Sequence, residues 1–263
     1  MERLSVLKEK EVIALASSHT RRKKGKIIVE GLRAIETVIQ SGLLPDFIVV
    51  SPTSLTGEGH KFVATQIAGK FPEFECDENR FKKLTDTLHS QGLLAVVHER
   101  FEPITPEILH HSRLGLYLDE INDPGNFGTI IRSATAFRAD YIAVSPNSVE
   151  LANPKVIRAS AGLIFSLPIE KVAAPETFFD LLQSNEIDLI GADSAARMEL
   201  AEVSTGRKVC LAIGSEARGL NEWTRKACQN LFRIRTADSV ESLNAASATA
   251  IALYYFSTKL KLL

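Results

Sequence analysis

Hydrophobic positions along this chain follow two alternating spacings. Short apolar runs, typical of buried strands, are separated by stretches in which apolar side chains recur every three or four residues, as in amphipathic helices. Alternation of this kind predicts an α/β fold. Strands are expected at 26–29, 47–50, 74–76, 93–97, 114–118, 141–144, 188–192, 208–213 and 231–234, and helices at 2–16, 31–39, 60–68, 79–84, 128–137, 153–160, 178–182 and 245–260.

The pattern breaks once, between residues 100 and 112, where Pro103 and Pro106 limit regular structure. We therefore predict a smaller N-terminal α/β domain over 1–99, a linker over 100–112 and a second domain over 113–263. Strands of the second domain are almost wholly apolar, as expected for a parallel sheet covered on both faces. With 263 residues and 45% hydrophobic content, the chain can form a core in each domain.

The first candidate for chemistry is the segment 122–132, Asn-Asp-Pro-Gly-Asn-Phe-Gly-Thr-Ile-Ile-Arg. It follows an apolar strand and is predicted to form a glycine-rich turn that opens a helix at Gly128. Free backbone N–H groups at such a helix start can bind an anion, and Arg132 is expected one turn into the helix, beside Asn126. Taken alone, the segment is better explained as an ordinary strand-to-helix connection.

Two further turns follow strands of the second domain. The segment 214–220 offers glycines for close backbone approach together with the carboxylate of Glu216, and Ser242-Leu243-Asn244 precedes a helix rich in small residues. Taken singly, Ser242 is a helix N-cap and the small-residue helix is a packing surface. Parallel sheets bind ligands at the carboxyl ends of their strands, so the three turns are candidates for one site. The sequence motifs of dinucleotide-binding folds, Walker-type NTPases, zincins and α/β-hydrolases do not occur.

Together these segments resemble the SpoU/TrmH family of RNA ribose 2′-O-methyltransferases, within the SPOUT class. The motifs at 122–132, 214–220 and 240–244 stand in the family's order, and 153–162 with Leu167-Pro168 adds a fourth match. The resemblance covers residue 114 to the C-terminus. The N-terminal domain is similar, less specifically, to the family's ribosomal-protein-like RNA module through 29–35 and Gln91-Gly92.

This resemblance implies a parallel-sheet domain with a deep trefoil knot, in which the last helix is threaded through a loop. It also implies S-adenosylmethionine as the cofactor, RNA as the substrate and a homodimer formed through the knotted domain by the helix at 129–137 and the last helix. The residues expected to bind the cofactor are Ala192, Ile213, Gly214, Glu216, Gly219, Ile234 and Leu243.

The family pattern assigns catalysis to Asn126, Arg132, Glu216, Ser242 and Asn244. In the family, the counterpart of Arg132 has been proposed as general base, but a guanidinium group is effectively always protonated. We favour the hypothesis that Arg132 binds the 3′ phosphate and lowers the pKa of the neighbouring hydroxyl. One departure from the pattern is that the third motif reads Ile234-Arg235-Thr236-Ala237-Asp238, where the family usually has Ile-Pro-Met and then a glycine two residues on.

Because the formal net charge is −1, the phosphates of an RNA partner would have to be bound by local basic patches rather than by the overall charge. The run at 21–26 is either a solvated loop or a phosphate-contacting arm. Because the chain has a separate N-terminal domain rather than a basic terminal extension, ribosomal RNA is favoured over transfer RNA. The candidate RNA contacts are Arg21, Arg22, Lys23, Lys24, Arg33, Arg132, Lys155 and Arg158.

Other classes of function receive less support. The three cysteines are far apart and in no metal-binding spacing, and the adjacent His110 and His111 would diverge, so we expect reduced core thiols and no metal. No signal peptide or apolar run long enough for a membrane is apparent, which predicts a cytoplasmic protein. The alternative function is a catalytically weak or inactive knotted RNA-binding ribosome-assembly factor, which the altered third motif supports. An unrelated nucleotide-dependent enzyme would require four motifs to match by chance.

Overall fold

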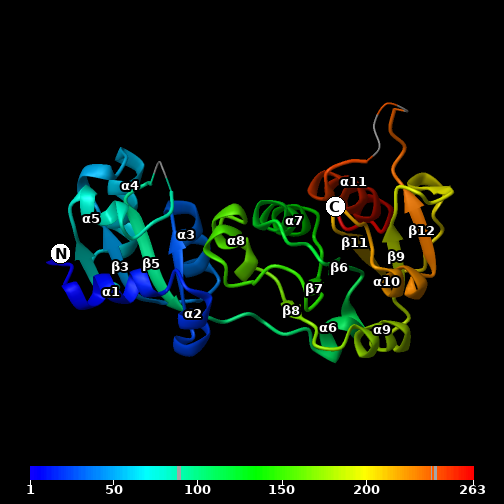
Figure 1. The fold of residues 1–263 in the computed structure, drawn as a ribbon, viewed down its shortest axis with the longest axis horizontal. Helices are drawn as coiled ribbons and strands as arrows, with labels where there is room; N and C mark the ends of the chain where they lie inside the picture. The colour runs from blue at the N-terminus through cyan, green and yellow to red at the C-terminus, as the bar shows by residue number, and fades with distance from the viewer. Residues whose placement is uncertain (88–89, 238, 240–241) are drawn as a thin grey trace. The chain divides into compact units, whose positions relative to one another are not determined.

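The computed structural model describes residues 1–87, 90–237, 239 and 242–263, which form two compact units (Figure 1). The first unit comprises Met1–Arg100 and Leu151–Ser166, and the second comprises Phe101–Glu150 and Leu167–Leu263. The sequence had suggested that Leu151–Ser166 belongs to the second domain. In the structure, α8 (Pro154–Ala159) within this segment packs on β2 (Lys26–Glu30), and the Arg158 guanidinium lies 3.0 Å from the Glu30 carboxylate.

The first unit is built on a mixed sheet with the strand order β1-β4-β3-β5-β2. The β1/β4 and β4/β3 pairs are parallel, whereas β5 runs antiparallel to both β3 and β2. One face of the sheet packs against α1 and α5, where Val12, Phe47 and Phe81 are buried. The elements are β1 (Glu2–Arg3), α1 (Val6–Ala14), α2 (Ser18–Lys24), β2 (Lys26–Glu30), α3 (Leu32–Gln40), β3 (Pro45–Val50), α4 (Gly57–Phe62), a π-helical turn (Val63–Ile67), β4 (Glu73–Glu75), α5 (Glu78–Lys82), β5 (Leu93–His98) and α8 (Pro154–Ala159), with 3-10 turns at Pro52–Ser54 and Leu163–Phe165.

The basic run in this unit is helical, so the solvated-loop interpretation was wrong. It forms most of α2, which ends at Gly25 in the left-handed conformation that glycine adopts at little cost. Arg21 is only 3% exposed, and its guanidinium donates hydrogen bonds to the carbonyl oxygens of Leu15 and Ala16, at 3.0 and 2.7 Å. The guanidinium therefore ties α2 to the end of α1.

The second unit contains a sheet with the order β10-β12-β9-β11-β6-β7-β8, and every pairing among its described strands is parallel. This is the α/β class with a parallel sheet that the sequence predicts. Its elements are α6 (Pro106–His111), β6 (Leu114–Asp119), α7 (Pro124–Ala136), β7 (Tyr141–Val144), β8 (Ile169–Lys171), α9 (Pro175–Ser184), β9 (Asp188–Ala192), β10 (Met198–Glu199), a 3-10 turn (Leu200–Glu202), β11 (Val209–Gly214), α10 (Glu222–Ala227), β12 (Asn230–Arg233) and α11 (Ala245–Lys259).

Helices cover both faces of this sheet (Figure 1). One face packs against α6, α9 and α10 in a core containing Leu109, Tyr117 and Phe178. On the other side α7 and α11 pack against each other, and Phe256 of α11 contacts the ring of Phe232 on β12. Because successive strand residues point to opposite faces, the nearly continuous apolar runs satisfy both layers at once.

Two of the differences from the predicted elements concern segments that contain proline. Helix α7 begins at Pro124 instead of Gly128, because Asp123 caps it by accepting a hydrogen bond from the Asn126 N–H at 2.7 Å and proline suits the first helical position. The predicted linker contains α6, which buries Leu109 in the core of the second unit. The proline and glycine residues of these segments had indicated irregular structure, but the apolar and capping residues beside them support helices.

The cysteines are free thiols, as predicted. Cys76 and Cys210 are buried and Cys228 is half-buried. Burial raises the pKa of the Cys76 thiol to about 11 and the pKa values of Cys210 and Cys228 to about 12. These groups are therefore protonated and unreactive at neutral pH.

Candidate active site

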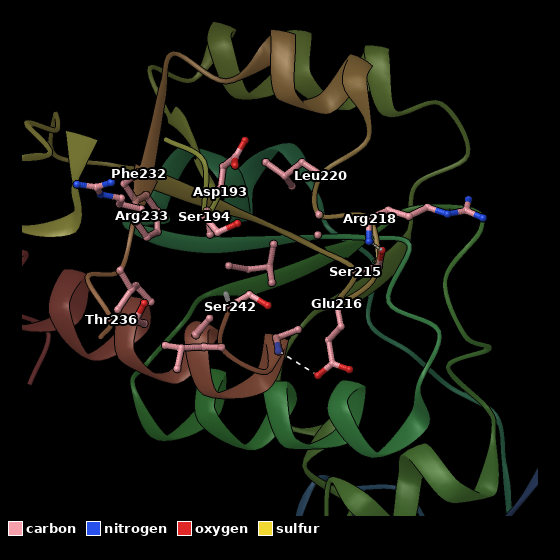
Figure 2. Close-up of a pocket in the computed structure, with 18 of the residues that line it drawn as sticks. Asp193, Ser194, Ser215, Glu216, Arg218, Leu220, Phe232, Arg233, Thr236 and Ser242 are labelled. Atoms are coloured by element: carbon pink, nitrogen blue, oxygen red, sulfur yellow. Dashed lines mark hydrogen bonds between the residues drawn. The ribbon is translucent and has the colours of Figure 1, made fainter. Parts of the chain in front are cut away.

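A cavity of about 740 Å³ opens at the carboxyl ends of β9, β11 and β12, and Figure 2 shows it in close-up. This volume lies within the range of roughly 300–1,000 Å³ typical of small-molecule sites. Backbone turns form much of its lining, and small side chains at the start of α11 leave room beside them. The lining residues are Ala192, Asp193, Ser194, Glu199, Ile213, Gly214, Ser215, Glu216, Ala217, Arg218, Gly219, Leu220, Arg225, Phe232, Arg233, Ile234, Arg235, Thr236, Ala237, Ser242, Leu243, Ala245 and Ala248.

The turn after β11 forms one wall of the cavity and is folded tightly on itself. Ser215 and Gly219 exchange two backbone hydrogen bonds, at 3.1 and 2.8 Å, and Gly219 has a φ of +67°. A Cβ atom at Gly214 would lie 2.0 Å from the Gly219 carbonyl carbon, so only glycine permits this approach. The glycines thus have a steric role that the sequence alone had suggested only in general terms.

At one end of the cavity, a single amide joins three segments that are distant in the sequence. The Asn244 Nδ2 group donates to Asn126 Oδ1 at 2.9 Å and to the Glu216 carboxylate, which also accepts from the Ala245 N–H at 3.3 Å. Figure 2 shows Glu216 pointing towards the first turn of α11. Asn244 Oδ1 in turn accepts from the N–H groups of Ala246 and Ser247, at 3.0 and 3.2 Å, and so caps α11.

Residues of the cavity lining also form two ion pairs. Arg225 is 3.0 Å from Asp193, and Arg233 is 3.7 Å from Glu199. Apolar side chains, including Ile213, also line the cavity. The cavity therefore offers both apolar contact surface and hydrogen-bonding groups.

Comparison with known proteins places this geometry in a family. Residues 113–254 match the model of the SpoU rRNA Methylase family, and residues 8–95 match that of the MRM3-like substrate binding domain. The first match spans more than half of the chain. The chain belongs to the SpoU rRNA methylase family. The resemblance identified from the motifs is thereby confirmed.

Several relatives match this chain nearly end to end. The Bacillus subtilis 23S rRNA (guanosine(2553)-2′-O)-methyltransferase RlmP is 25% identical over 97% of this chain and 99% of its own. A crystal structure of an RNA 2′-O ribose methyltransferase superposes with a TM-score of 0.83 at 27% identity, covering all of both chains. An AdoMet-bound rRNA methyltransferase from Sinorhizobium meliloti has a TM-score of 0.84 at 24% identity, over 99% and 97% of the two chains, which shows the shared fold.

In this SpoU methylase, the residues predicted to bind the cofactor all line the cavity: Ala192, Ile213, Gly214, Glu216, Gly219, Ile234 and Leu243. Of the predicted catalytic residues, Glu216 and Ser242 also line it. Asn126 and Asn244 are not in the lining, but Asn244 donates hydrogen bonds to both Asn126 and Glu216. Ser242 does not cap the helix, since Asn244 does so.

Arg132 does not lie beside Asn126 as predicted. Because α7 starts at Pro124, Arg132 follows Asn126 by six helical residues, roughly 9 Å along the axis and on a different side of the helix. Its side chain is exposed and makes no hydrogen bond or ion pair within the described ranges of the chain. The structure thus brings together Asn126, Glu216 and Asn244 but leaves the guanidinium outside their network.

The altered third motif contributes Ile234, Arg235, Thr236 and Ala237 to the cavity lining. Asp238, together with Val240 and Glu241 at the start of the motif that ends in Asn244, lies outside the described residues. The missing proline and glycine therefore do not prevent this segment from forming part of the cavity.

The predicted RNA contacts differ in their availability. Arg22, Lys23, Lys24, Arg33 and Lys155 are exposed, although Lys24 is 3.8 Å from Glu11. The Arg21 prediction was wrong, because its buried guanidinium is bound to backbone carbonyls. Arg158 is already paired with Glu30, so its charge is partly compensated.

Two residues near the cavity were missed by the sequence analysis. Asp119 is fully buried at the end of β6, and both of its oxygens accept hydrogen bonds from Asn221, immediately after the 214–220 turn. The only signal was an acidic residue ending an apolar strand. No group of three or more His, Cys, Asp or Glu side chains suited to a metal, and no helix able to cross a membrane, occurs among the residues that the structure describes.

Proposed function

We propose that this protein methylates the 2′-hydroxyl of a ribose in ribosomal RNA, using the 740 Å³ cavity for its methyl donor. Membership of the SpoU rRNA methylase family makes the chain a methyltransferase that uses S-adenosylmethionine. The proposal therefore concerns the acceptor RNA and the roles of individual residues. The observation that carries it is the joining of Asn126, Glu216 and Asn244 at one end of the cavity.

The lining of the cavity fits the donor. Gly214 and Gly219 allow close approach to the backbone, and Ile213, Ile234 and Leu243 offer an apolar surface suited to a purine ring. When bound, S-adenosylmethionine supplies an electrophilic methyl group on a sulfonium. The tight 215–219 turn and the first turn of α11 would hold its polar groups through backbone atoms.

The acceptor side must overcome the weak nucleophilicity of an alcohol at neutral pH. We assign Asn126 and Glu216 to orienting the ribose, because Asn244 fixes both side chains and is itself fixed as the cap of α11. Such preorganisation contributes through alignment and through stabilisation of developing charge. Ser242, in the cavity lining, would order the donor segment.

Arg132 is assigned to the phosphate on the 3′ side of the reacting ribose. Its exposed guanidinium is available for a bidentate phosphate contact, which would stabilise the alkoxide developing next to it and so lower the effective pKa of the hydroxyl. It cannot serve as a base, because a guanidinium remains protonated.

RNA outside the reacting nucleotide would be bound by the first unit. Arg22, Lys23 and Lys24 form an exposed basic stretch on α2, and Arg33 and Lys155 are exposed elsewhere in the same unit. The end-to-end match to RlmP, which acts on 23S rRNA, supports ribosomal RNA as the acceptor. Sequence identity of 25% leaves the modified nucleotide to experiment.

A homodimer and a trefoil knot in the second unit complete the proposal. On α11, Ile251 and Tyr254 are 42% and 57% exposed, and Tyr254 contacts the ring of Phe137 at the end of α7. This apolar surface supports a second copy of the chain as the partner at α7 and α11.

The proposal is tested by mapping 2′-O-methyl sites in ribosomal and transfer RNA from cells with and without the protein. We expect one or more ribosomal sites to disappear with the gene and to return with the wild-type copy. Loss of a transfer-RNA site alone would overturn the ribosomal assignment. Unchanged maps, together with no S-adenosylmethionine binding at millimolar concentration, would favour an inactive assembly factor.

A further inference from the structure

The buried carboxylate of Asp119 accepts hydrogen bonds that have no part in the catalytic roles assigned so far. Asp119 is the last residue of β6 and has no exposed surface. Its Oδ2 atom accepts from the Asn221 backbone N–H and its Oδ1 atom from the Asn221 side-chain Nδ2, both at 2.8 Å. One residue, 102 positions further along the chain, therefore satisfies both oxygens of a buried carboxylate.

Asn221 is fully engaged by this contact. While its Nδ2 donates to Asp119, its Oδ1 accepts from the Thr224 N–H at 2.8 Å and caps α10. Its side chain thus has one orientation that satisfies both partners. The position at which α10 starts is consequently fixed relative to the end of β6.

The contact between Asp119 and Asn221 fixes the shape of the turn that forms one wall of the cavity. At the beginning of the turn, Gly214 pairs with Asp119 in the parallel β11/β6 register. At its end, Asn221 is held by the Asp119 carboxylate. The same residue of β6 therefore fixes both ends of the 215–220 segment, and the cavity-lining residues Glu216 and Leu220 lie between the two attachment points.

Burying a carboxylate is costly, so the arrangement calls for an explanation beyond stability. Burial raises the pKa of Asp119, while the hydrogen bonds from Asn221 oppose that rise. Hydrophobic residues of similar volume often stabilise a core as well or better. A carboxylate, in contrast, can hold a backbone N–H and a side-chain amide at the same time in a fixed geometry.

We propose that Asp119 is a positioning residue for the methyl donor, which holds the 215–220 turn in its binding shape by clamping Asn221. This inference rests on the proposed function, in which that turn binds S-adenosylmethionine. Asp119 acts through Asn221 and the turn, and it contacts neither substrate in this scheme.

The test compares Asp119→Asn with the exchanged pair Asp119→Asn/Asn221→Asp. In the single variant, the new amide faces the Asn221 amide, and two donors oppose each other. In the exchanged pair, the amide introduced at position 119 can accept from the backbone N–H of position 221 and donate to the new carboxylate there, which can still cap α10. The three hydrogen bonds are thus retained with their side-chain partners reversed.

Asp140 provides a matched control. Its Oδ2 accepts from the backbone N–H groups of Arg113 and Leu114, at 2.7 and 3.0 Å, at the opposite end of β6. That end lies roughly 17 Å along the strand from Asp119. Asp140→Asn therefore neutralises a carboxylate that accepts backbone hydrogen bonds at the other end of the same strand, without touching the turn.

Isothermal titration with S-adenosylmethionine, thermal denaturation and steady-state kinetics on RNA are measured for all variants. We expect Asp119→Asn to weaken donor binding at least tenfold and to raise the donor KM, the exchanged pair to recover to within about threefold, and Asp140→Asn to keep wild-type affinity even where its Tm falls. If Asp119→Asn binds the donor as tightly as Asp140→Asn does, or the exchanged pair shows no recovery, the proposal is wrong. Failure of the wild-type protein to bind the donor would instead refute the proposed function.

Discussion

A methyl group added at position 214 would meet the backbone of the turn that follows it. The nearest atoms are the Gly219 carbonyl carbon at 2.0 Å and the Leu220 nitrogen at 2.2 Å, whereas ordinary contact begins at 3.4 Å. In Gly214→Ala the turn must therefore retreat by more than an ångström. That movement would also strain the two backbone hydrogen bonds between Ser215 and Gly219.

The expected cost follows from these contacts. Overpacking costs about 1–3 kcal/mol, and each weakened backbone hydrogen bond adds about 0.5–1.5 kcal/mol. If about 3 kcal/mol of this appears as lost donor affinity, the dissociation constant for S-adenosylmethionine rises roughly 100-fold. Isothermal titration with S-adenosylmethionine measures this change directly, and circular dichroism reports whether the variant remains folded.

Two other glycines serve as graded controls. A Cβ at Gly219 meets nothing within 4 Å, but its φ is +67°, so Gly219→Ala carries only a backbone cost of about 1–2 kcal/mol and weakens binding about tenfold. Gly57, in the first unit, has open space and no positive φ, so Gly57→Ala should bind normally. Wild-type affinity in Gly214→Ala, or a larger loss in Gly219→Ala, would refute the steric reasoning.

The remaining predictions concern the acceptor side, the basic helix and the thiols. Arg132→Lys should keep donor affinity but lose most turnover, because lysine cannot make the bidentate phosphate contact; undiminished single-turnover rates would count against that role. Replacing Arg22, Lys23 and Lys24 together by alanine should reduce the slope of the logarithm of the RNA-binding constant against the logarithm of the salt concentration by about 2 to 3. Arg21→Met should instead lower thermal stability, because it removes the hydrogen bonds to the carbonyl groups of Leu15 and Ala16. Cys76, Cys210 and Cys228 should resist iodoacetamide in the native protein at pH 8 and react after denaturation, since burial raises their thiol pKa values to about 11, 12 and 12; rapid native labelling would contradict the buried core.

Patterns confined to short stretches of sequence predicted much of the fold. The apolar runs of β6, β9 and β11 identified buried parallel strands, because each run is long enough to be covered on both faces. Their carboxyl ends had to meet at one edge, which brought the 214–220 turn and Ala192 into one cavity. Asn244 and Glu216 could be anticipated from the family motifs, although their shared hydrogen bond could not.

What escaped prediction depends on contacts between distant residues. The packing of α8 with the first unit includes the Arg158–Glu30 pair, whose residues are separated by 128 positions. The burial of Arg21 depends on carbonyl groups at the end of α1, which no charge pattern reveals. Asp119 resembles any acidic strand end until its two hydrogen bonds from Asn221 are seen.

The central claim is that this cavity delivers a methyl group from S-adenosylmethionine to a ribose hydroxyl of ribosomal RNA. The most direct test incubates the purified protein and trideuteromethyl-labelled S-adenosylmethionine with ribosomal RNA from cells that lack the gene, followed by nucleoside mass spectrometry. We predict a trideuterated 2′-O-methyl nucleoside with wild-type protein and little or none with Arg132→Lys. Label found only on a base, or no label in ribosomal RNA although the donor binds, would contradict the account.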